Sequence, residues 1–71
     1  MTLENLRRLA YDAGFYVVTR VVKRRTFYAL ISSAVRYINF ENILFISTSQ
    51  KEVEERIRKL VSDREKMGYK N

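Results

Sequence analysis

The spacing of the apolar residues changes at Gly14, and this change restricts the folds open to the chain. Before Gly14 they recur three or four positions apart, which is the period of one helix face: Leu3, Leu6, Leu9, Ala10 and Ala13. After Gly14, residues 15–22 are mostly aromatic or β-branched, which is typical of a strand. Because glycine readily takes the left-handed conformation that ends helices, we predict a helix over about 2–13 and a strand over about 15–22.

A second strand is predicted over about 26–32, with the basic segment Lys23-Arg24-Arg25 as the turn between the strands. A three-residue turn would place these pairs on one face: Val22–Thr26, Arg20–Tyr28 and Val18–Leu30. The other face would pair Val21 with Phe27 and Val17 with Ile31. A shift of one residue would exchange the faces. The segment lacks the Gly or Asn that favours tight hairpins, so the turn length stays open.

Residues 33–42 fit two alternatives, because neither hydrophobic period dominates so short a segment. Ser33 could begin a short helix, or residues 35–40 could form a strand that turns at Glu41-Asn42. In the helical alternative the inward side chains would be Ala34, Val35 and Ile38.

The last part of the chain predicts a strand over about 43–47 and a helix over about 50–67. The strand is almost entirely apolar, so we expect it in the centre of the sheet, covered on both faces. Ser49 and Glu52 have the spacing of a capping box at the start of the helix. The expected buried stripe is Val53, Ile57, Leu60, Val61 and Met67. The expected ion pairs at i,i+4 are Glu52–Arg56, Glu54–Arg58 and Glu55–Lys59.

Together these elements predict a single α+β domain over residues 1–71, with two helices packed on one face of a mainly antiparallel sheet. The chain has no cysteine and no histidine, so neither a disulfide nor a Cys/His zinc site can stabilise it. A core of this size contributes only about 3–5 kcal/mol. The predicted register also leaves apolar side chains on one sheet face, which either residues 33–42 or a second copy must cover: Val18, Val22 and Leu30. We therefore expect a homo-oligomer, most simply a dimer.

Basic and aromatic residues are concentrated in residues 13–40, which contain five basic residues, six aromatic residues and no acidic residue. The whole chain has a net charge of +6, and basic groups attract phosphates, while aromatic rings stack on unpaired bases. The predicted nucleic-acid-binding residues are Arg20, Lys23, Arg24, Arg25, Arg36, Tyr16 and Tyr28. A simpler alternative is that Tyr and Arg pair across strands and that the charged turn keeps the hairpin soluble.

Catalysis is not expected from this composition. Before residue 50 the acidic residues are Glu4, Asp12 and Glu41, too few and too scattered for a metal-dependent nuclease site. We therefore predict no enzymatic activity, no metal and no cofactor. No segment approaches the ~20 apolar residues that span a bilayer, and the start lacks a signal-peptide pattern. The expected location is the cytoplasm, without a membrane partner.

The opening helix, the segment Ala13-Gly14-Phe15-Tyr16-Val17-Val18, the following strands and the closing helix resemble the α-β-β-β-α order of double-stranded-RNA-binding-like domains. Small toxin-type mRNA interferases share this layout, but they depend on a histidine in the second strand, and this chain has none. The basic helix-start motif of double-stranded-RNA binders is also missing, since the last helix begins Gln50-Lys51-Glu52-Val53. The resemblance favours RNA as a partner and argues against the corresponding catalysis.

The leading expectation is a small, basic, non-enzymatic module that binds DNA or RNA through its basic and aromatic hairpin. The alternative is a homo-oligomeric protein–protein interaction or structural module, in which the same sheet face is the interface. Lys, Arg and Glu make up twenty of the 71 residues, a composition that leans towards a thermophilic source.

Overall fold

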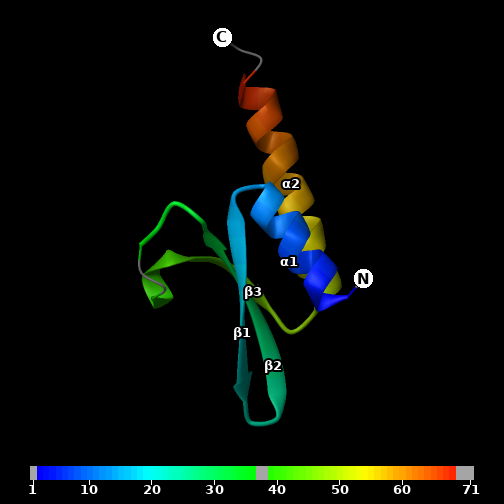
Figure 1. The fold of residues 1–71 in the computed structure, drawn as a ribbon, viewed down its shortest axis with the longest axis vertical. Coiled ribbons are helices and arrows are strands. Elements are labelled where there is room, and N and C mark those ends of the chain that lie inside the picture. The colour runs from blue at the N-terminus through cyan, green and yellow to red at the C-terminus, as the bar shows by residue number, and fades with distance from the viewer. Residues whose placement is uncertain (1, 37–38, 69–71) are drawn as a thin grey trace.

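In sequence, the strands lie between an N-terminal and a C-terminal helix, and the predicted α+β class is confirmed (Figure 1). The computed structural model describes residues 2–36 and 39–68. In chain order the elements are α1 (Leu3–Asp12), β1 (Phe15–Val22), β2 (Arg25–Ser32), the 3-10 helix η1 (Phe40–Asn42), β3 (Ile43–Ser47) and α2 (Gln50–Gly68). Strands β1 and β3 span the residues predicted for them, and β2 begins one residue earlier than predicted.

Helix α1 is capped at both ends by residues close to it in sequence. The Thr2 hydroxyl accepts a hydrogen bond from the Asn5 N–H at 3.2 Å, which satisfies one free donor of the first turn. At the other end, Gly14 has φ +90°, a left-handed conformation that turns the chain directly into β1. The Gly14 carbonyl then accepts a hydrogen bond from the Ser33 N–H at 2.9 Å. This bond ties the turn to the segment that follows β2.

The three strands form one antiparallel sheet in the order β1-β2-β3. The prediction that residues 43–47 form a central strand is therefore wrong, because β2 is central and β3 is an edge strand. Two side chains of β3, Leu44 and Ile46, are about half exposed, at 52% and 49%. A mostly apolar strand is typical of a sheet covered on both faces, and here the described residues leave one face uncovered.

The turn between β1 and β2 contains two residues, Lys23 and Arg24, instead of three. Val22 therefore pairs with Arg25, and the whole predicted register is wrong by one residue. The observed pairs include Arg20–Phe27, Val18–Ala29 and Val17–Leu30. Because side chains alternate along a strand, this shift exchanges the two faces of β2.

Both helices pack on the same face of the sheet (Figure 1). Between the two layers lies a core of buried apolar side chains: Leu6, Ala10, Phe15, Val17, Leu30, Val53 and Ile57. The core takes residues from the predicted stripe of each helix, while the side chain of Met67 lies outside the described part. The hairpin of β1 and β2 projects beyond the helices at its tip (Figure 1).

Among the described residues of 33–42, neither the predicted helix from Ser33 nor the predicted strand is present. Ser32, not Ser33, makes the local turn, since its hydroxyl accepts from the Ala34 N–H at 3.2 Å. Asn39 directly precedes η1, and its side-chain oxygen accepts from the Asn42 N–H at 3.2 Å. Ile38, expected to point inward, lies outside the described residues.

Helix α2 begins with a hydrogen-bond network that differs from a simple capping box. Ser49 accepts from the Glu52 N–H through its hydroxyl at 3.3 Å, as predicted. The carboxylate of Glu52, however, accepts from the Ser47 hydroxyl, and that hydroxyl accepts from the Ser49 N–H at 3.0 Å. Ser47 therefore takes the place that the capping box assigns to the glutamate.

Of the three predicted ion pairs on α2, Glu54–Arg58 is formed, with an N–O distance of 3.0 Å. In the part of the chain that the structure describes, the other two are absent. Arg56 instead lies over the Phe45 ring, 4.6 Å from its centre. Although α2 has 19 residues, neither it nor α1 is long and apolar enough, over the described ranges, to cross a bilayer.

Replacing Gly14 with alanine tests the positive φ at the α1–β1 junction. A Cβ there would meet Arg64 Nη1 at 3.8 Å, an ordinary contact, so the penalty comes from the backbone conformation. We expect G14A to lose about 1 kcal/mol of unfolding free energy, or about 4–8 °C in Tm, measured by thermal unfolding. Gly14→Asn, which tolerates this conformation better, should lose less, and an equal loss in both variants would contradict this explanation.

Candidate nucleic-acid interface and an open apolar face

The tip of the β1–β2 hairpin is formed by two basic residues in an unusual backbone conformation. Lys23 has φ +50° and Arg24 has φ +66°, as in a type I′ turn. Such a turn matches the twist of the flanking strands but normally contains Asn and Gly, because other residues cost about 1 kcal/mol or more in this conformation. Both side chains are exposed. The tip is therefore a strained and highly basic surface feature.

Two more arginines lie behind the tip. Arg25 begins β2 opposite Val22, and Arg20 lies opposite Phe27. From their positions along the strands, Arg20 and Arg25 belong to the same sheet face, where they are diagonal neighbours, a geometry that separates side chains by about 7–8 Å. Both are exposed, and in the described part of the chain neither forms an ion pair. Four basic residues thus share one end of the sheet.

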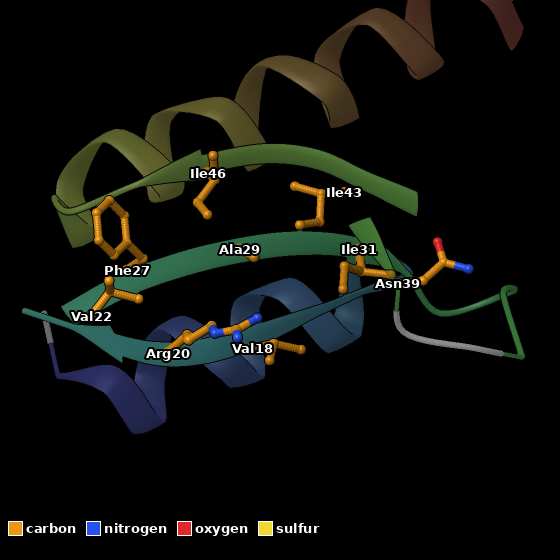
Figure 2. A pocket seen from close by; sticks show the side chains of 9 residues that line it. All are labelled: Val18, Arg20, Val22, Phe27, Ala29, Ile31, Asn39, Ile43 and Ile46. Carbon is orange, nitrogen blue, oxygen red and sulfur yellow. The ribbon is translucent and has the colours of Figure 1, made fainter. Parts of the chain in front are cut away.

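The face of the sheet opposite the helices contains a shallow groove of about 410 Å³ (Figure 2). Its lining is Val18, Arg20, Val22, Phe27, Ala29, Ile31, Asn39, Ile43 and Ile46. Seven of these nine residues are apolar, and they come from all three strands. Ala29, the smallest of them, forms part of the floor on the central strand (Figure 2). The groove exists because no helix covers this face among the described elements.

Asn39 lines one end of the groove. It lies beside Ile31 there (Figure 2), and Ile31 is fully buried. Among the described residues of 33–42, one of the two expected covers, Asn39 is the one that lines this face. Val22 and Ile46 nevertheless remain 43% and 49% exposed. The rest of the face is uncovered by the residues that the structure describes.

Tyr28, one of the predicted stacking residues, lies on the helix side of the sheet. Its register position places it beside Thr19 on β1 and Ser47 on β3, and its ring packs against the core. The hydroxyl accepts a hydrogen bond from the Gln50 side chain at 3.1 Å. The expectation that Tyr28 shares a face with Arg20 is wrong, because the turn is one residue shorter than assumed.

Tyr16 and Arg36 are exposed but lie far from the hairpin tip. Tyr16 is next to the first residue of β1 and contacts Tyr11 of α1, with ring centres 6.0 Å apart. Arg36 follows β2 at the end of the sheet opposite the turn. Eight residues of strand, about 26 Å at 3.3 Å per residue, separate that end from the tip. The seven predicted residues therefore do not form one continuous surface: four form the basic tip, two are distant from it, and Tyr28 lies on the helix side.

Phe27 and Ile31 take the place on the open face that was assigned to Tyr28 and Leu30. The sequence does not indicate directly which face of β2 is buried, because either face is apolar enough to pack against the helices. A turn of Lys and Arg offers no Gly or Asn to indicate a two-residue loop. The turn length, and with it the face, could not be read from the sequence.

No protein-family model, curated protein or solved structure matches this chain. Over the described residues, acidic side chains do not form a group of three or more that could hold a metal ion.

Replacing Tyr28 with phenylalanine tests its assignment to the helix side. Y28F removes the hydrogen bond to Gln50 and should lower the unfolding free energy by about 1 kcal/mol, measured by chemical denaturation. Binding of nucleic acid should be unchanged, because the hydroxyl that is removed lies on the helix side of the sheet, where it bonds to Gln50. Loss of binding in a variant that stays folded would show that Tyr28 belongs to the binding surface.

Proposed function

We propose that this protein binds nucleic acid through the basic tip of the β1–β2 hairpin, mainly by contacts to the phosphate backbone. The observation that carries the proposal is the pair of basic side chains, Lys23 and Arg24, at both positive-φ positions of the turn. A neutral Asn-Gly turn would fit this geometry with less strain. Strain held at a surface turn points to a function of the side chains placed there.

The charge around the tip supports the same proposal. Arg20 and Arg25 add two cations within the same end of the sheet, and residues 13–40 contain no acid to neutralise them. Clustered like charges raise the local positive potential and attract a polyanion. Exposed guanidinium groups can contact phosphate oxygens through two parallel hydrogen bonds.

The proposed contacts are independent of base sequence. Base stacking on tyrosines has little support, because Tyr28 faces the core and Tyr16 lies at the far end of β1. A projecting hairpin with basic side chains suits a groove or a backbone of either DNA or RNA. Binding to single- and double-stranded forms of both therefore has to be compared directly.

The double variant Lys23→Asn/Arg24→Gly separates binding from stability. It installs the favoured type I′ residues, so we expect the unfolding free energy to rise by about 1 kcal/mol. The same change removes two cations, so affinity for labelled nucleic acid should fall about ten-fold or more near 0.1 M salt. The slope of log Kobs against log salt for duplex DNA should become shallower by about two.

Arg7→Gln/Arg8→Gln is the matched control, because it removes the same charge from exposed positions on α1. This control should bind nearly as well as the natural chain. Equal weakening by both variants would mean that net charge, and not the hairpin tip, drives binding. Absence of binding by the natural chain at low salt would overturn the proposed function itself.

A further inference from the structure

We propose that the groove on the open sheet face is a docking site for an acidic, amphipathic helix of a partner protein. This proposal concerns the apolar face of the sheet, which shares Arg20 and Arg25 with the basic end of the hairpin, and its test with peptides does not depend on nucleic-acid binding. Three observations support the proposal: the shape of the groove, the apolar residues that line it and the single cation, Arg20, among them.

The dimensions of the face match one helix. Three strands spaced about 4.8 Å apart span about 10 Å, and a helix with its side chains is about 10–12 Å wide. The groove follows β1 from Val18 to Val22, about 13 Å for four steps of 3.3 Å, which is between two and three turns of helix. A helix here would complete a three-layer arrangement with a covered sheet.

The hollow shape also distinguishes among occupants. Val22 and Ile46 are about half exposed, so a small molecule would stay largely in contact with solvent. A second copy would bring another hollow face against this one, and two hollows leave an unfilled space between them. A convex helix fills the groove and buries the floor at Ala29.

The charge of the face specifies an acidic partner. Arg20 is the charged residue of the groove lining, and within the described residues it has no ion-pair partner. Arg25 lies next to it on the same face. A second copy would place two such basic faces together. A helix with apolar residues at i, i+3, i+4 and i+7 complements the apolar lining, and glutamates that flank these residues complement the positive charge.

The probe is a capped, labelled peptide of about 14 residues, a helix of about 21 Å that is longer than the groove. It has leucines at that spacing and glutamates on its flanks. A second peptide replaces each glutamate with lysine. Titration of isotope-labelled protein, followed by amide NMR shifts and by fluorescence anisotropy, gives the binding residues and Kd. We expect the acidic peptide to shift the amides of Val18, Arg20, Ala29 and Ile46, and to bind about five-fold or more tightly than the lysine peptide.

Charge reversal at Arg20 tests the recognition directly. Arg20→Glu should lose the preference for the acidic peptide and favour the lysine peptide instead. Arg7→Glu, which makes the same change in net charge on the helix layer, should keep the original preference. Ala29→Leu should weaken both peptides by filling the floor, and thermal unfolding confirms that each variant is folded.

Three results would overturn the proposal. One is the absence of shifts on the open face with either peptide. Another is equal affinity of the two peptides for the natural chain, which would remove the role of Arg20. The third is concentration-dependent shifts of the groove amides without peptide, accompanied by a doubled mass, which would identify a second copy as the occupant.

Discussion

The length of one turn determines how the rest of this structure is arranged. Lys23 and Arg24 connect β1 to β2 without a third residue, and so Val22 pairs with Arg25. This pairing decides which side of β2 meets the helices. Leu30 and Tyr28 enter the core, while Phe27 and Ile31 form the open face. Because side chains alternate between the two faces of a strand, a register shift of one residue moves every side chain of β2 to the other face.

The junction between α1 and β1 holds the helix layer on one side of that sheet. The left-handed Gly14 turns the chain, and Arg64 of α2 donates a hydrogen bond to the Ala13 carbonyl at 3.0 Å. The same guanidinium lies over the Phe15 ring, 5.4 Å from its centre. One side chain from the second half of α2 thus contacts both elements of the junction. Both helices therefore pack on one face of the sheet, and the described residues provide no element that covers the opposite face.

Charge and apolar surface are distributed unequally between the two layers. The helices carry acids and bases together, as the Glu54–Arg58 pair shows, whereas residues 13–40 carry bases alone. The sheet layer therefore presents both the basic tip and the apolar groove. The two proposed interactions use neighbouring surfaces that share Arg20 and Arg25. A polyanion would contact the exposed cations, and a helix would fill the hollow apolar face.

Much of this arrangement followed from the sequence alone. The order of elements and the α+β class were predicted from three patterns: the helical spacing before Gly14, the β-branched run after it and the Ser49 cap. These patterns were sufficient because helix and strand formation depend on residues close in sequence. The sequence also located the basic segment at Lys23-Arg24-Arg25. The tertiary structure alone decided the turn length, the edge position of β3 and the face of Tyr28. Each depends on which strands pair and on which apolar side is covered, and the energy of that choice lies in contacts between segments distant in sequence.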